Sequence, residues 1–89
     1  MVSKELVIKN KSGLDSKPAV KFIQKASDFK SSIWIERDER KVNAKSLLGL
    51  LSLSVASGEK IVLIADGEDE NQALTELENY LDSGLGESI

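Results

Sequence analysis

The chain has 89 residues, of which 40% are hydrophobic and 30% are charged, and its formal net charge is −3. These proportions are typical of one soluble domain, which we expect to span residues 1–89, and they exclude disordered, fibrous and membrane-spanning chains. The sequence contains no cysteine and no histidine, so only carboxylates remain as metal ligands, and we expect neither a metal nor a cofactor.

Charge is divided unevenly along the chain. Residues 1–45 hold 11 Lys or Arg against 6 Asp or Glu, whereas residues 46–89 hold 1 against 9, which gives +5 and −8. Such a bias usually reflects solvated faces, although a polarised surface would steer a partner of complementary charge. The basic half has no Lys/Arg run with interleaved aromatics, which argues against nucleic acid as a direct partner. No signal peptide is evident at the N-terminus, so we expect a cytoplasmic protein that does not bind membranes.

The first elements in the chain are a short strand and a helix. Residues 5–8 are predicted to be the strand, and residues 10–13 supply turn chemistry after it. Asp15 or Ser16 can cap the helix that follows, and Pro18 falls in its first turn, where no N–H is needed. The apolar residues of this helix follow the i, i+3, i+4, i+7 spacing of a single buried face: Ala19, Phe22, Ile23 and Ala26.

A hairpin is predicted next. Residues 32–36 are β-branched and aromatic, and residues 37–40 can turn the chain back into a strand at residues 41–43. Residues 47–55 then form an apolar run of helical length. Residues 61–65 read as a strand that is buried on both faces or nearly so.

The last element is predicted to be a helix that begins at a capping box formed by Asp69 and Gln72 and is stopped by Gly84 and Gly86. Its apolar stripe contains Ala73, Leu74, Leu77, Tyr80 and Leu81. The order is then β-α-β-β-α-β-α. Since only three helices are available, we expect an α+β open-faced sandwich with the helices on one face of a four-stranded sheet.

Several motifs in this order resemble the HPr family, the phosphocarriers of the sugar phosphotransferase system. The matching stretches run along the whole chain: Lys11-Ser12-Gly13-Leu14, Pro18-Ala19, Lys41-Val42-Asn43-Ala44-Lys45-Ser46, Gly49-Leu50, Ser52-Leu53 and Gly67-Glu68-Asp69-Glu70. The resemblance implies the HPr-like open-faced β-sandwich, with an antiparallel sheet.

The family's phosphohistidine motif is broken in this chain. Where the family has glycine-leucine-histidine-alanine-arginine-proline, the chain has Gly13-Leu14-Asp15-Ser16-Lys17-Pro18. A phosphocarrier needs an imidazole nitrogen or a comparable nucleophile, and aspartate normally needs a metal and further charged helpers to accept phosphate. We therefore expect Asp15 to be a helix cap that takes no part in catalysis. Lys17 replaces an arginine and lacks its bidentate grip on phosphate.

The second family motif, which ends at Ser46, is intact. In Gram-positive members this serine is the target of an ATP-dependent kinase, so the resemblance implies phosphorylation of Ser46 by an HPr kinase. From the sequence alone, a helix N-cap before Leu47 is a sufficient explanation of Ser46, and the local spacing is weak evidence for phosphorylation. A phosphate there would lie at the positive end of a helix dipole and close to Lys45, and it would preserve the local structure.

Six apolar side chains follow Ser46 within nine residues, which is more than one buried stripe requires: Leu47, Leu48, Leu50, Leu51, Leu53 and Val55. We therefore expect some of them to be exposed as a docking surface. By resemblance, Leu47, Leu48 and Leu51 occupy the positions at which family members contact their partners, next to Asp15, Lys17 and Lys45.

A lost histidine combined with a retained serine favours a regulatory member of the family that has no enzymatic activity. The leading hypothesis is a corepressor in carbon catabolite repression that binds a catabolite-control transcription factor after phosphorylation at Ser46. Two alternatives involve phosphotransferase system enzymes as partners. In one, Asp15 accepts phosphate; in the other, the chain binds those enzymes unproductively, with the charge of Asp15 imitating part of a phosphohistidine.

Overall fold

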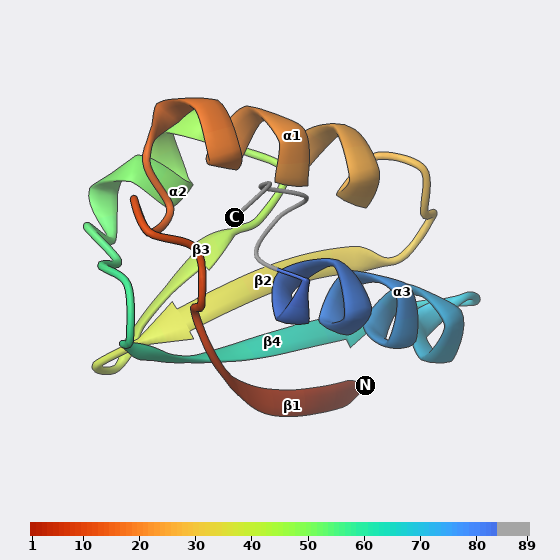
Figure 1. The fold of residues 1–89 in the computed structure, drawn as a ribbon. Coiled ribbons are helices and arrows are strands. Elements are labelled where there is room, and N and C mark those ends of the chain that lie inside the picture. The colour runs from red at the N-terminus through yellow and green to blue at the C-terminus, as the bar shows by residue number, and fades with distance from the viewer. Residues whose placement is uncertain (84–89) are drawn as a thin grey trace.

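The computed structural model describes residues 1–83 and confirms the predicted order of elements (Figure 1). The elements are β1 (Val2–Val7), α1 (Ser16–Ala26), β2 (Ser32–Arg37), β3 (Arg40–Asn43), α2 (Leu47–Ser52), β4 (Lys60–Asp66) and α3 (Glu70–Asp82). Gly84 and Gly86, which were expected to stop the last helix, lie outside the described residues.

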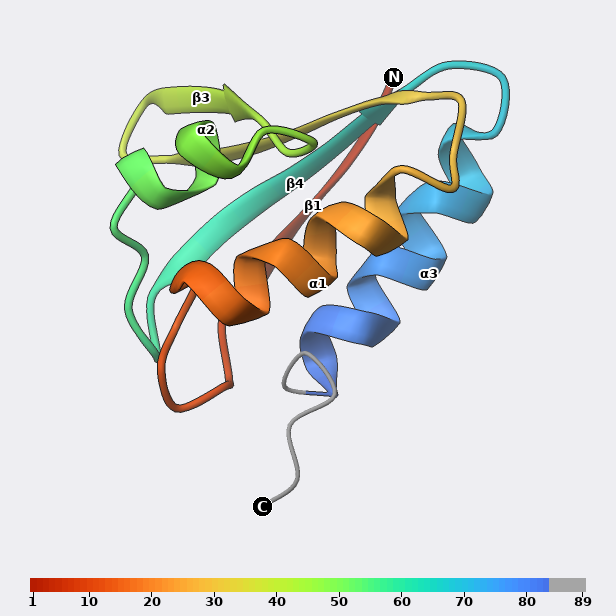
Figure 2. The same cartoon turned by 90° about the horizontal axis from the view of Figure 1, so that it is seen from above.

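The four strands form one antiparallel sheet in the order β1-β4-β2-β3, and the three helices cover one face of it, as predicted (Figure 2). The last strand in the sequence therefore lies between the first two. The register places Ile61 opposite Leu6 and Leu63 opposite Ile35, so that these side chains share the face that the helices cover.

Two boundaries differ from the sequence prediction because neither is marked by a hydrophobic pattern. β1 begins at Val2, where residues 5–8 were expected, and Leu6 is its only buried residue. It forms by pairing with β4 along its whole length. The apolar run at 47–55 is helical only as far as Ser52, and Leu53 and Val55 are buried in the loop that follows.

The turn of the predicted hairpin is a tight two-residue loop. Arg37 pairs with Arg40, and the intervening Asp38 and Glu39 both have positive φ angles, of 51° and 69°. This is the conformation of a type I′ turn, whose twist matches that of the strands and in which Asn-Gly is the favoured pair.

The core lies between the sheet and the helices. α1 contributes Ala19, Phe22 and Ala26, as its spacing predicted, while α2 contributes Leu50 and α3 contributes Ala73, Leu77 and Leu81. On the sheet, Ile33, Ile35, Ile61, Leu63 and Ala65 complete the buried layer. Trp34 and Ile64 pair across β2 and β4 on the opposite face.

Ion pairs join the basic N-terminal half to the acidic helix α3. Lys4 lies 3.1 Å from Glu78, Lys9 lies 3.6 Å from Asp82, and the N-terminal ammonium lies 3.1 Å from Glu70. The partners are partly or largely exposed, so each pair contributes little to stability. Together they neutralise, within the molecule, part of the charge bias seen along the sequence.

Candidate functional site

Asp15 is the N-cap residue of α1 and is exposed. Its backbone is extended, with φ −80° and ψ 179°, and its carboxylate Oδ1 accepts a hydrogen bond from the Ser16 N–H at 2.8 Å. The predicted capping role is therefore confirmed. Lys17, two residues further on, is also exposed. Both side chains are available to a partner, and the negative charge of Asp15 is favourable at the positive end of the helix dipole.

A close contact with the loop after α2 positions the segment that leads into Asp15. The Leu14 N–H donates to the Val55 carbonyl at 3.0 Å. Gly13 has a φ of 66°, and a Cβ added there would lie 2.2 Å from the Val55 carbonyl oxygen, so only glycine fits. The Gly13-Leu14 part of the motif thus fixes where α1 begins relative to α2.

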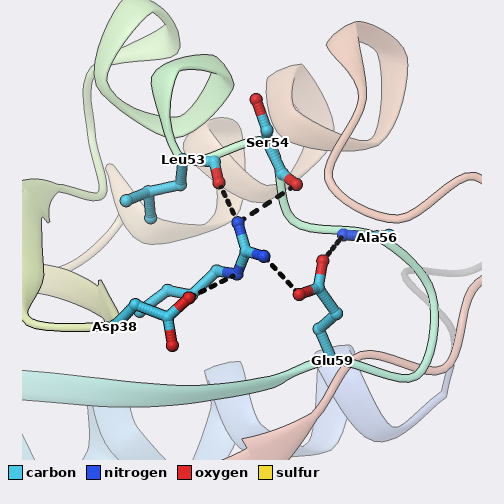
Figure 3. Close-up of polar contacts among 6 residues, drawn as sticks. Asp38, Leu53, Ser54, Ala56 and Glu59 are labelled. Atoms are coloured by element: carbon cyan, nitrogen blue, oxygen red, sulfur yellow. Dashed lines mark hydrogen bonds and ion pairs between the residues drawn. The ribbon is translucent and has the colours of Figure 1, made fainter.

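Arg37 holds the other side of the same loop through contacts with Leu53, Ser54 and Glu59, which are labelled in Figure 3. Its guanidinium donates to the carbonyls of Leu53, at 2.6 Å, and Ser54, at 3.4 Å, and it forms an ion pair with Glu59. Glu59 also accepts from the Ala56 N–H at 2.7 Å. This bond, together with Arg37, lowers the pKa of the Glu59 carboxyl. We refer to these contacts of Arg37 and Glu59 as the Arg37 clamp.

The sequence analysis did not single out the Arg37 clamp. Its members come from β2, from the end of α2 and from the loop before β4, and no spacing in the sequence links them. The available signal was Arg37 itself, which the sequence analysis assigned to the turn after the strand at residues 32–36.

Ser46 is the N-cap residue of α2 and is half-buried. Its Oγ accepts from the Gly49 N–H at 3.1 Å, and its carbonyl accepts from the Leu50 N–H at 3.0 Å. A Cβ added at Gly49 would lie 3.4 Å from the Ser46 Oγ, so glycine leaves space beside the hydroxyl. The predicted N-cap is confirmed.

Lys45 does not take the position that the sequence suggested. Its ammonium donates to the carbonyls of Phe29, at 2.8 Å, and Ser31, at 3.0 Å, in the loop after α1. The side chain is therefore committed to that loop and is not free to lie beside Ser46, because the two carbonyl bonds fix its direction.

The surplus leucines divide as expected into buried and exposed members. Leu47 is 38% exposed and Leu48 is 81% exposed, whereas Leu51 is half-buried against the core. Leu50 is fully buried. α1, which packs against α2, carries a further exposed apolar side chain that the sequence analysis did not single out, Val20, which is 40% exposed. Its position outside the buried spacing of α1 was the available signal.

Asp69 is the N-cap residue of α3, as predicted, but its side chain makes no capping hydrogen bond, so the predicted capping box with Gln72 is wrong. Its carboxylate instead accepts from the backbone N–H groups of Lys30 and Ser31, both at 2.9 Å, and from the Ser31 hydroxyl. These bonds, that to the hydroxyl foremost, lower the pKa of Asp69 to about 2. Gln72 is the third residue of α3, and its amide donates to the Glu76 carboxylate at 2.9 Å.

Within residues 1–83, no three acidic side chains gather in a way that would hold a metal ion, and no helix is long and apolar enough to cross a membrane. The candidate site is thus an exposed surface formed by the starts of α1 and α2. It offers the carboxylate of Asp15, the ammonium of Lys17, the hydroxyl of Ser46 and a group of aliphatic side chains. Such a surface is suited to recognition by another protein.

Comparison with known proteins identifies the family. A family model described as the PTS HPr component phosphorylation site matches residues 2–83. The chain belongs to the HPr family. The HPr-like protein Crh of Bacillus subtilis is 46% identical over 81 residues, which cover 91% of this chain and 95% of that protein.

Solved HPr structures share the fold. The crystal structure of HPr-C-His from Thermoanaerobacter tengcongensis is 45% identical, covers both chains completely and has a TM-score of 0.95. A crystal structure of Bacillus subtilis Crh, described as a swapped dimer, is 44% identical with a TM-score of 0.77 and covers 94% of this chain and 97% of that one. This chain is therefore a phosphocarrier-type protein with the HPr fold. Unlike the histidine-phosphorylated members described by the family motif, it has no histidine.

Proposed function

We propose that this chain is a regulatory HPr-family protein that acts by docking onto other proteins and neither carries phosphate on histidine nor catalyses a reaction. The observation that carries the proposal is Asp15, an exposed helix cap at the position where the family motif has its phosphohistidine. A carboxylate has no imidazole nitrogen to form a phosphoramidate, and the chain supplies no histidine elsewhere.

In this proposal the regulatory input is phosphorylation of Ser46 by an HPr kinase. The serine lies in an intact family motif, and its Oγ accepts one hydrogen bond, from Gly49, which leaves the hydroxyl proton available for transfer to a kinase base. A phosphate adds about −1.5 to −2 charges and three acceptor oxygens. The domain stays folded, because Ser46 lies at a helix end, and the modification changes only the surface that a partner meets.

The output is binding to a catabolite-control transcription factor as a corepressor. Leu47 and Leu48 supply exposed apolar area directly after Ser46, so one partner surface can contact both the phosphate and the leucines. Charge-assisted hydrogen bonds to the phosphate and burial of the leucines then contribute together to affinity.

The experiment begins with the family's serine kinase and ATP, followed by intact mass and site mapping of the wild type and of Ser46→Ala. Calorimetry then compares phosphorylated and unmodified protein on the host's own repressor. We expect Ser46→Ala to abolish the gain in affinity, and Leu47→Ala to weaken binding by about 1–3 kcal/mol while circular dichroism stays unchanged. Val7→Ala is the matched control, since Val7 is also 38% exposed but lies in β1. Equal affinity with and without phosphate would contradict the corepressor role.

A second candidate is a module that engages phosphotransferase system enzymes through Asp15. The exposed carboxylate at the start of α1 favours it, either as a phosphate acceptor or as a negative charge in the place of a phosphohistidine. Incubation with phosphoenolpyruvate and the first enzyme of the system separates the two forms. A hydroxylamine-sensitive adduct at Asp15 supports phosphate transfer, whereas inhibition of an ordinary HPr without any adduct supports unproductive binding.

A further inference from the structure

A small cavity lies at the start of β2, outside the surface formed by Asp15, Ser46 and the leucines. Its volume is about 250 Å³. The residues that line it come from the loop after α1, from β2 and from the end of β3 and the turn after it: Lys30, Ser31, Ser32, Ile33, Trp34, Asn43 and Lys45. The volume is below the range of about 300–1,000 Å³ that is typical of sites for drug-sized ligands, so any ligand here is small.

Lys45 supplies this cavity with a positive charge. The ammonium is part-buried and donates to two backbone carbonyls, those of Phe29 and Ser31, which fix its position. Neither acceptor carries a charge, and within residues 1–83 no carboxylate lies within ion-pair distance of this ammonium. A partly desolvated charge without a counter-ion is unfavourable, and the third N–H of the ammonium remains to be used.

Other groups around the cavity are also donors. Lys30 is exposed and, like Lys45, has no ion pair in the described part of the chain. Ser32 and Asn43 also line the cavity, and the Asn43 Oδ1 accepts from the backbone N–H of Lys45 at 2.8 Å. Trp34 provides an aromatic wall, and the ammonium of Lys41 lies 4.7 Å from its ring centroid. This ammonium adds positive charge beside the cavity.

The carboxylates near these lysines do not cancel that charge. Asp69 lies behind the same loop, and its oxygens accept the backbone N–H groups of Lys30 and Ser31 and the Ser31 hydroxyl. Asp66 is opposite Ser32 in the sheet and forms an ion pair with the N-terminal ammonium at 3.4 Å. Glu36 is opposite Lys41, two residue pairs further along the hairpin than Trp34.

We propose that this cavity binds a small oxyanion, in which phosphate or carboxylate oxygens accept hydrogen bonds from Lys45, Lys30 and Ser32. The site is separate from phosphorylation of Ser46, because neither the Ser46 hydroxyl nor the exposed leucines line it. The proposal therefore does not depend on the corepressor role.

The test uses inorganic phosphate as the probe and Trp34 as the reporter, since it is the only tryptophan in the chain. Sodium phosphate is titrated into ¹⁵N-labelled protein at constant ionic strength, balanced with sodium chloride, while the indole N–H signal and the backbone amides of residues 30–45 are followed. We expect a saturable shift confined to the residues that line the cavity. Acetate in a parallel titration shows whether carboxylates bind as well as phosphate does.

One variant, with a matched control, tests whether Lys30 contributes to phosphate binding. Lys30→Gln should raise the dissociation constant for phosphate about fivefold or more, because it removes one charged donor from an exposed side chain that the fold does not need. Lys21→Gln is the matched control, since Lys21 is also exposed but lies on α1 away from the cavity, and it should bind as the wild type does. A linear response that chloride reproduces would refute the proposal, as would equal affinity in Lys30→Gln and the wild type.

Discussion

The Arg37 clamp predicts a specific cost for Arg37→Met, which keeps most of the aliphatic stem but removes the guanidinium. The substitution leaves the Leu53 carbonyl without its 2.6 Å donor and breaks the ion pair with Glu59. A hydrogen bond to a charged group contributes about 1.5–3 kcal/mol when buried. Here the two side chains are 25% and 32% exposed, so water screens part of that, and we expect the free energy of unfolding to fall by about 1–2 kcal/mol.

Urea unfolding measures this loss, and amide hydrogen exchange locates it. Because the clamped loop presents the Val55 carbonyl to Leu14, the Leu14 amide should exchange faster in Arg37→Met than in the wild type. Arg40→Met is the control, since Arg40 is exposed at the other end of the same turn, and it should stay within about 0.5 kcal/mol of the wild type. Equal losses in the two variants, or unchanged exchange at Leu14, would refute the reasoning.

The pH dependence of the clamp follows from the lowered pKa of Glu59. A carboxyl whose pKa is lower in the folded state stabilises the protein fully above its unfolded pKa and loses that effect as the pH falls through its folded pKa. The difference between Arg37→Met and the wild type should therefore shrink in acid. Urea titrations at neutral pH and below the ordinary pKa of glutamate measure it.

Three further predictions use other parts of the structure. Phosphoenolpyruvate and the first enzyme of the phosphotransferase system should leave the intact mass of the protein unchanged. Asp15→His should restore phosphate transfer only poorly, because Lys17 lacks the planar guanidinium with which arginine binds phosphate through two hydrogen bonds. Leu50→Ala should lower the free energy of unfolding by about 2–5 kcal/mol, whereas Leu48→Ala should change it by no more than about 0.5 kcal/mol; similar losses in urea unfolding would contradict the contrast in burial. Since the pKa of Asp69 falls from 3.8 to about 2, its stabilising effect should be lost as the pH drops through that interval, and acid unfolding of Asp69→Asn should show a smaller slope there.

The sequence predicted those features that local chemistry determines. The spacing of Ala19 and Phe22 identified the buried face of α1, and Ser46 was recognised as a cap because its hydroxyl needs only the backbone three residues away. The number of apolar residues after Ser46 predicted that some would be exposed, as Leu48 is, since a helix of six residues cannot bury every leucine that it carries.

The failures involve partners distant in sequence. Asp69 has the spacing of a capping box with Gln72, yet its carboxylate bonds a loop 38 and 39 residues earlier, because the sheet brings the start of β2 to the start of α3. Lys45 was likewise expected to lie beside Ser46 because the two are neighbours in sequence. Its ammonium instead donates to the carbonyl of Phe29, 16 residues away. Such contacts depend on the tertiary fold, which spacing alone does not describe.

The strand order has a consequence for synthesis of the chain on the ribosome. β4 separates β1 from β2, so a nascent chain that ends before residue 60 contains the β2–β3 hairpin but no strand with which β1 can pair. The apolar residues of α1 then also lack most of the sheet on which they pack. The complete sheet can therefore form only after β4, which ends at Asp66, has been synthesised, so folding waits for pairings between strands that are distant in sequence.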